Sequence, residues 1–467
     1  MKTLRIITGL IFCVGIACAN NNSSSKPYNV LFVVADDLNV DIASYGHPQV
    51  RTPNLDRLRA RGMQFNRAYS QYPLCNPSRN SFLTGLYPGT SGNLNNADHI
   101  RDLIPDIVTL PQLFKQNGYR TVSTGKVFHH RDPQSWNQIS NMYTGGLLPM
   151  DREPRFYQQG QEAKTKGEGA MLSDETVPWF EWRSVTEGEE YLKDFQVARA
   201  TMNRIDEIAA DGVPFFLGVG FARPHDPYFA PKRFFDMYPL ESLQLPQTPA
   251  DASPVPDHAF YNVFKAAFDK MTYQQKLEAM RAFYAGISYM DEQFGRIMEH
   301  LESKGLLDST VIVFIGDHGY QIGDKDYWNK AVLFERSCLA PMLIATPDMQ
   351  LKGESTNSIV EFIDIYPTLA ELCNLQAPKN LDGISLVPLL EDPAAPRSRK
   401  IAYSYVNADR SVRDSRYRYT VWKGGGHALW DHERDPDEHY NLADNPEYAA
   451  IVKRMRGYIE IMPEPNK

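Results

Sequence analysis

The chain has few cysteines, no excess of positive charge and no long hydrophobic run. Only five cysteines occur in 467 residues, which is too few for the disulfide framework of a small secreted domain. The formal net charge of −8 at pH 7 argues against a nucleic-acid partner. No segment is of low complexity, and no repeat has the period of a solenoid protein. The length allows a large core and more than one domain.

The start of the chain has the pattern of a targeting segment. Lys2 and Arg5 precede an apolar run at residues 6–16. That run suits a signal peptide and is too short to cross a bilayer as a helix. We therefore expect export to the bacterial periplasm or cell surface.

Two cleavage sites remain open. Cleavage after Ala19 would remove a signal peptide of residues 1–19, whereas cleavage before Cys18 would remove a lipoprotein signal of residues 1–17. The polar residues 20–27 then form a tether. In the second case a lipid on Cys18 would be the protein's one link to a membrane.

Three apolar, β-branched runs predict strands that are buried on both faces, as in a parallel sheet. They are residues 29–35, 214–220 and 310–315. Each is followed by polar residues, and in open α/β sheets ligands bind at this edge. The side chains expected there are Asp36, Asp37, His225, Asp317 and His318.

Amphipathic helices are expected between the strands, at residues 54–61, 109–117, 274–304 and 363–372. This alternation predicts an α/β sandwich around a mostly parallel sheet. The character changes near residue 395. Short strands at 401–405 and 417–422 and a closing helix at 448–461 predict a small antiparallel α+β subdomain. We therefore divide the folded part into a catalytic domain, 28–395, and a C-terminal subdomain, 396–467.

One cysteine lies in an unusual context. Residues 75–79 read Cys-Asn-Pro-Ser-Arg, and Thr84-Gly85 follow. A free cysteine is usually an inert buried thiol, but Pro77 predicts a turn here, and a hydroxyl and Arg79 lie close by. The run resembles the signature of type I sulfatases. The resemblance implies the alkaline-phosphatase-like fold and oxidation of Cys75 to formylglycine (3-oxoalanine), an aldehyde that hydrates to a geminal diol.

The resemblance extends from residue 29 to about residue 443. Gly118-Tyr119, Gly125-Lys126 and His129 have the spacing of a second sulfatase signature. Residues 435–442 resemble the C-terminal sequence of the family. The segments around Lys126, His225 and Asp317-His318-Gly319 are most similar to the iduronate-2-sulfatase branch.

The adjacent Asp36 and Asp37 indicate a cation site. Two carboxylates at one strand end repel each other unless something neutralises them, and oxygen ligands select hard ions such as calcium. The alternative is a pair of helix N-cap residues. The resemblance implies one Ca²⁺ held by five residues: Asp36, Asp37, Cys75, Asp317 and His318.

The remaining site residues take their roles from the resemblance. It implies that Arg79, Lys126 and Lys330 surround the anionic group of the substrate, and that His225 protonates the leaving oxygen. His129 is the candidate base that regenerates the aldehyde. An unperturbed histidine titrates near neutrality, which suits proton transfer. The alternatives are an exposed lysine at 126 and a basic surface patch at 129–131.

The sequence therefore predicts an exported sulfatase that hydrolyses sulfate monoesters of glycan fragments. The resemblance favours 2-O-sulfate on uronic acids of the heparin, heparan or dermatan type, and ulvan is the alternative. The expected partners are a sulfated oligosaccharide and a maturation enzyme, either formylglycine-generating or anaerobic sulfatase-maturating. A phosphoesterase of the same fold and an inactive glycan-binding lipoprotein are rival hypotheses. Cys338 and Cys373 either pair or stay free.

Overall fold

The computed structural model describes residues 27–140, 161–171, 177, 180–260, 262–397 and 399–464. The expected signal segment, its cleavage sites and Cys18 lie outside the described residues. Within the described part, no helix is long and apolar enough to span a membrane.

A sheet of eight strands forms the centre, in the order β14-β2-β13-β10-β1-β8-β4-β5. Strand β1 (Asn29–Ala35) pairs in parallel with β10 (Thr310–Gly316) and β8 (Phe215–Phe221). All residues of these strands are buried, which explains their continuous apolar sequence. The other strands are β4 (Arg120–Gly125), β5 (Gln138–Ser140), β13 (Met342–Ala345), β2 (Met63–Phe65) and β14 (Ser355–Thr356). Only the pairings of β13 with β10 and β2 are antiparallel in this sheet, so the predicted mostly parallel α/β sheet is confirmed.

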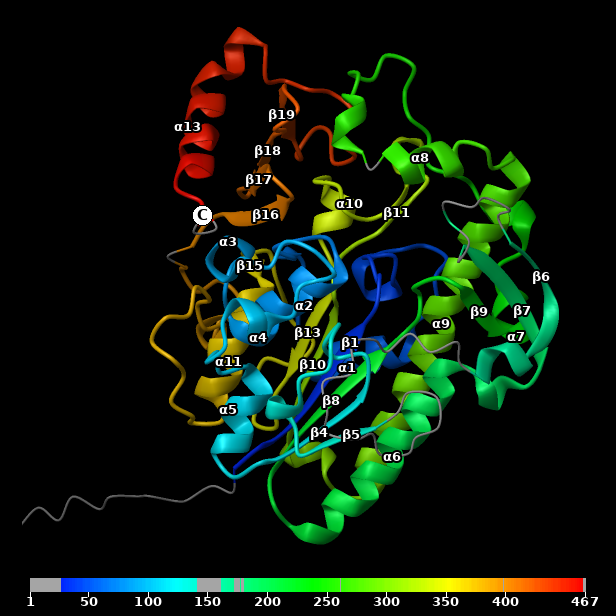
Figure 1. The fold of residues 1–467 in the computed structure, drawn as a ribbon, viewed down its shortest axis with the longest axis vertical. Coiled ribbons are helices and arrows are strands. Elements are labelled where there is room, and N and C mark those ends of the chain that lie inside the picture. Colours follow the sequence, from blue (N-terminus) through cyan, green and yellow to red (C-terminus); the bar gives the residue numbers. More distant parts are fainter. Residues whose placement is uncertain are drawn as a thin grey trace, which may run out of the picture.

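Helices cover both faces of the sheet (Figure 1). Alternate side chains of β1 enter different cores, because a strand directs successive side chains to opposite faces. One core contains α1 (Pro53–Arg61), α6 (Lys193–Asp211) and α9 (Tyr273–Ser303). The other contains α2 (Cys75–Thr84), α5 (Leu110–Gln116) and α11 (Ile365–Leu372). The four predicted helices are present, with ends shifted by one or two residues.

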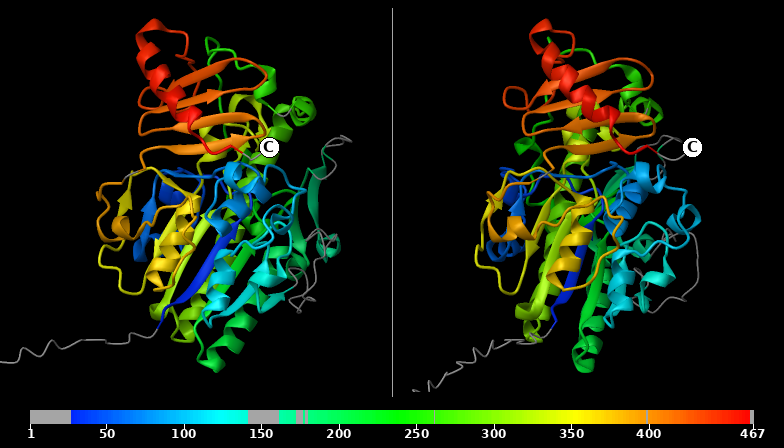
Figure 2. Two further views of the ribbon diagram at one scale, coloured as in Figure 1. Left: turned by 60° about the vertical axis from the view of Figure 1, so that its left-hand side comes forward. Right: turned by 90° about the vertical axis from the view of Figure 1, so that its left-hand side faces the viewer.

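A second sheet contains β16 (Ala402–Val406), β17 (Asp409–Arg413), β18 (Tyr417–Val421) and β19 (His427–Asp431), all antiparallel. The sequence predicted β16, β18 and the helix α13 (Ala449–Glu460), and missed β17 and β19. Figure 2 shows this sheet beyond the end of the central sheet at which β1 ends. The domain boundary at 395/396 stays a prediction.

Shorter elements surround the two sheets. Three strands form a small third sheet: β6 (Lys166–Met171), β7 (Glu181–Glu187) and β9 (Tyr228–Pro231). Two strand pairs are β3 (Ala68–Tyr69) with β15 (Val360–Glu361), and β11 (Gln321–Ile322) with β12 (Trp328–Asn329). The short helices are α3 (Pro88–Ser91), α4 (Ile100–Leu103), α7 (Lys232–Phe235), α8 (Asn262–Phe268), α10 (Glu335–Cys338) and α12 (Val387–Glu391).

An ion-pair network joins the C-terminal sheet to the rest of the molecule. Glu335 accepts hydrogen bonds from Tyr69 Oη at 2.7 Å and from Arg418 Nη2 at 2.5 Å, and Arg413 Nε lies 3.2 Å away. Burial opposes ionisation of Glu335, but Arg413 and the other nearby cations hold its pKa below the usual value. Glu335 therefore links α10 to Tyr69 and to the C-terminal sheet.

The structure also decides between the two alternatives for the remaining cysteines. Cys338 and Cys373 are both free and buried, and they belong to different cores. Burial raises the pKa of Cys338 to about 11 and that of Cys373 to about 12. Both are therefore inert core thiols.

The close packing of β8 on the segment after β4 gives a stability prediction. A Cβ at Gly220 would lie 2.1 Å from the backbone carbonyl carbon of Lys126, so Gly220→Ala must push these segments apart. We expect a loss of about 1–3 kcal/mol in the free energy of unfolding, measured by chemical denaturation. The control is Gly457→Ala in α13, where no atom lies within 4 Å of the new Cβ; it should stabilise the protein by up to about 1 kcal/mol. Equal effects of the two variants would contradict this account.

Candidate active site

The site forms where β1, β8 and β10 end. Asp36 and Asp37 follow β1, and Asp317 and His318 follow β10. The Asp37 backbone N–H donates to Asp317 Oδ1 at 2.9 Å, and the His225 N–H donates to the Asp36 carbonyl at 3.1 Å. The three strand ends are thus fixed to one another through the backbone, as the sequence predicted from their position at one edge.

Cys75 is the first residue of α2, and its side chain is buried. The expected turn at Pro77 is therefore wrong, because Pro77 lies in the first turn of a helix. A proline is tolerated there, since the first N–H groups of a helix have no partner within it. The helix places Cys75 against the strand ends.

Three carboxylates converge beside the thiol. Asp36, Asp37 and Asp317 each offer an oxygen, and these atoms lie within 4.8 Å of one another. All three side chains are buried. Burial raises the pKa of Asp37, and it raises the pKa of Asp317 to about 7. Carboxylates this close together repel one another, and their oxygens suit a hard divalent cation.

His318 is oriented as a ligand for the same ion. Its Nδ1 donates to the Gly319 carbonyl at 2.8 Å, so the lone pair of the neutral ring lies on Nε2. Nε2 is buried and lies 3.5 Å from Asp37 Oδ1 and 3.6 Å from Asp317 Oδ2. It forms no hydrogen bond with the described residues. The three carboxylates and His318 are therefore placed to hold one divalent cation. Cys75 would offer that ion an oxygen only after its oxidation, and ligation of calcium stays a prediction.

Arg79 forms hydrogen bonds with two of the three carboxylates. Its guanidinium is fully buried; Nε donates to Asp317 Oδ2 and Nη2 to Asp36 Oδ1, both at 3.0 Å. Nη1 donates to the carbonyls of Lys126 and Val127. These contacts hold the ends of β1 and β10 together. A direct contact of Arg79 with the substrate's anionic group stays a prediction.

Two lysines lie around the thiol. Lys126 Nζ is 2.5 Å from Asp36 Oδ2. Lys330 Nζ contacts Asp37 and lies 3.3 Å from Cys75 Sγ. Burial alone would raise the pKa of Cys75, but Lys126 and Lys330 lower it well below the usual value. An anion at this position is therefore favoured.

Two histidines complete the group, and their environments differ. Burial lowers the pKa of His129 to about 4, although a hydrogen bond with Cys75 opposes the shift. Burial also disfavours the charged form of His225, but Asp37, Asp226 and Asp36 together outweigh burial and raise its pKa well above the usual value. His129 is therefore a base at neutral pH, and His225 is an acid.

A cavity of about 570 Å³ opens onto Cys75, His225 and Lys330. Its lining also includes Lys193 and Asn407, which the sequence analysis missed. Lys193 belongs to α6 and Asn407 to the turn between β16 and β17. They come from distant segments with no local motif, so no signal in the sequence distinguished them.

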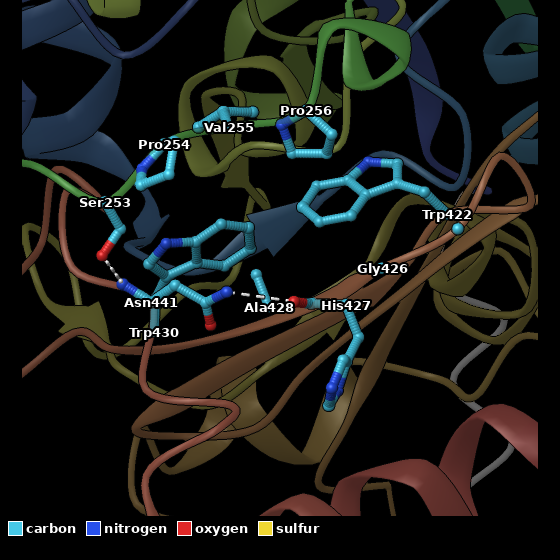
Figure 3. Close-up of a pocket in the computed structure, with 11 residues that line it drawn as sticks. Ser253, Pro254, Val255, Pro256, Trp422, Gly426, His427, Ala428, Trp430 and Asn441 are labelled. Carbon is cyan, nitrogen blue, oxygen red and sulfur yellow. Dashed lines mark hydrogen bonds between the residues drawn. The ribbon is translucent and has the colours of Figure 1, made fainter.

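A separate cavity of about 300 Å³ lies between residues 253–256 and the β18–β19 hairpin. Figure 3 shows Trp422 and Trp430 on one side of it and Pro254 and Pro256 on the other. None of the residues predicted to be catalytic lines it.

Comparison with known proteins shows the family to which the chain belongs. The family model for sulfatases matches residues 28–375, and the model for the C-terminal part of N-sulphoglucosamine sulphohydrolase matches residues 323–464. A sulfatase of Formosa agariphila is 31% identical over 456 residues, covering 94% of this chain and 87% of its own. The iduronate 2-sulfatase of Mus musculus is 27% identical over 544 residues, covering 95% and 96%.

The fold also occurs in a solved structure of a protein in complex with its substrate D-glucosamine-2-N,6-O-disulfate. That structure has a TM-score of 0.72 and 21% sequence identity, and covers 93% of this chain and 97% of the other. The protein is thus a sulfuric ester hydrolase, and its α/β architecture is the alkaline-phosphatase type of fold. It belongs to the sulfatase family, as a type I sulfatase.

The carboxylate cluster predicts a response to calcium. Ca²⁺ should raise the melting temperature of the metal-stripped protein, because an ion that binds only the folded state stabilises it by about 2.7 kcal/mol at a hundred times its Kd. Asp37→Asn should abolish most of this response in calorimetry and thermal melts. Asp308→Asn removes an exposed carboxylate and should leave the response intact. An undiminished response of Asp37→Asn would contradict the site.

Proposed function

We propose that this protein is an exported sulfatase that removes 2-O-sulfate from uronic acid residues of glycan fragments, with Cys75 matured to formylglycine. The observation that carries the proposal is the position of Cys75 at the inner end of an open cavity, 3.3 Å from Lys330 Nζ and beside three buried carboxylates. Export is supported by the signal-like residues 1–19, and the substrate class by similarity to iduronate 2-sulfatase along 95% of the chain.

Binding of the sulfate group depends on the lysines. A sulfate monoester is an anion, and its negative charge spreads over the peripheral oxygens as the ester bond breaks. Lys126 and Lys330 are held in place by Asp36 and Asp37, so they need no rearrangement to meet this charge. Preorganised cations of this kind stabilise a transition state more than flexible ones.

The matured residue 75 and the bound ion would supply the nucleophilic hydroxyl of a hydrated aldehyde and the Lewis acid that makes it more acidic. The site accounts for the proton movements. His225 Nδ1 donates to the Asp226 carbonyl at 2.6 Å, so the exchangeable proton of the charged ring is on Nε2, ready for the leaving sugar oxygen. His129 is neutral and accepts the proton from residue 75 when sulfate leaves.

Three variants at two cysteines test the nucleophile. Cys75→Ala should lose essentially all sulfate release, because no other group at the site can form the sulfated intermediate. Cys75→Ser should form one covalent sulfate per protein and stop, since a serine has no second hydroxyl to expel it; intact mass spectrometry would show the added group. Cys373 does not line the cavity, so the variant Cys373→Ala should stay active. Continued turnover by Cys75→Ala would overturn the mechanism.

The substrate is tested by ion chromatography of sulfate released from defined disaccharides and from ulvan oligosaccharides. We expect release from 2-O-sulfated uronates. Release from ulvan alone would identify the algal substrate, and hydrolysis of an aryl phosphate in place of an aryl sulfate would favour the phosphoesterase. Tight binding without sulfate release by matured enzyme would favour the inactive glycan-binding protein.

A further inference from the structure

The lining of the active-site cavity contains a lysine that the mechanism does not use. Lys193 is the first residue of α6, and its side chain is 13% exposed. It lines the same cavity as Cys75, His225 and Lys330. Lys193 therefore offers the contents of this cavity a further cation in addition to Lys330.

Lys193 is fixed by a buried carboxylate that it shares with another cation. Its Nζ lies 3.4 Å from Glu162 Oε2, and its backbone N–H donates to Glu162 Oε1 at 3.1 Å. Arg223 Nη2 donates to the same Oε1 at 2.7 Å. Burial would raise the pKa of Glu162, but Lys193 and Arg223 lower it, so Glu162 is ionised. Asp194, which accepts from the Arg223 N–H at 3.0 Å, is a second carboxylate beside Arg223. Glu162 thus fixes the Lys193 ammonium in the lining of the cavity.

Besides Lys193, the cationic side chains in the described lining are His225 and Lys330. Lys330 is paired with Asp37 at the inner end, and Asp226 Oδ1 lies 3.0 Å from His225 Nδ1. Asn96 and Asn407 contribute neutral amides; the Asn96 Oδ1 accepts from the Asn76 N–H at 3.0 Å. The outer cavity therefore presents hydrogen-bonding groups for hydroxyls and a cationic group at Lys193.

We propose that Lys193 binds the carboxylate of the uronic acid whose sulfate lies at Cys75. This inference rests on the proposed function and names the group that would give it specificity. A 2-O-sulfated uronate carries two anions at different positions of one ring, the sulfate at C2 and the carboxylate attached to C5. A cavity with one cationic region at the nucleophile and another on its wall matches that pair. A charge-assisted hydrogen bond of this kind is lost when the carboxylate is esterified.

The test compares Lys193→Gln with wild type on a 2-O-sulfated uronate disaccharide, its carboxyl methyl ester and an aryl sulfate. For the free acid we expect KM to rise roughly 10- to 100-fold with kcat nearly unchanged, as for a lost hydrogen bond to a charged group. KM for the methyl ester and the aryl sulfate should not change. Lys193→Arg should restore most of the affinity. Lys304→Gln, which removes an exposed lysine paired with Asp206, is the control.

The possible results separate this inference from the proposed function. A rise in KM for all three substrates would assign Lys193 a purely structural role through Glu162, and no rise for the free acid would exclude the contact. Either result overturns the inference while the proposed function stands. Wild type that cleaves the aryl sulfate but no uronate would overturn both. Wild type alone gives a measurement that needs no variant: equal KM values for the acid and its methyl ester would also refute the contact.

Discussion

The stability of the structure depends on how it holds three buried carboxylates close together. Asp36, Asp37 and Asp317 repel one another, and burial makes the repulsion stronger. Arg79 joins Asp36 to Asp317, while Lys126 and Lys330 each hold one aspartate. These charges are attached to the central strands, so the sheet and the site form one unit.

The same cations serve stability and chemistry. Lys330 contacts both Asp37 and the thiol of Cys75, so its charge stabilises the carboxylate and prepares the position for an anion. A buried pair that loses one partner leaves an uncompensated charge, typically at a cost of about 3–5 kcal/mol. Substitutions here therefore change folding and turnover together, and kinetic data need a parallel measurement of stability.

The sequence predicted those parts of the molecule whose residue pattern lies within one continuous segment. Continuous apolar runs predicted β1, β8 and β10, and the polar residues after them predicted Asp36, Asp37 and Asp317 at one edge. The helix at Cys75 was missed because Pro77 favours a turn as readily as a first helical turn. Lys193 and Asn407 were missed because only the tertiary fold brings α6 and the C-terminal sheet to the cavity. Strands β17 and β19 mix polar and apolar residues, which gave no clear periodic signal.

The cavity is lined by residues that lie far apart in the chain, from Tyr72 to Asn407. Asn407 belongs to the turn between β16 and β17 of the C-terminal sheet. The tail after α13 binds back to the body of the protein, where Tyr405 Oη donates to the Pro463 carbonyl at 3.0 Å and Arg410 pairs with Glu464. All strands of the central sheet precede residue 357, whereas Val406 and Asn407 of the cavity lining come later in the chain. A chain shortened at the C-terminal sheet would keep the carboxylates and Cys75 but lack part of the cavity wall.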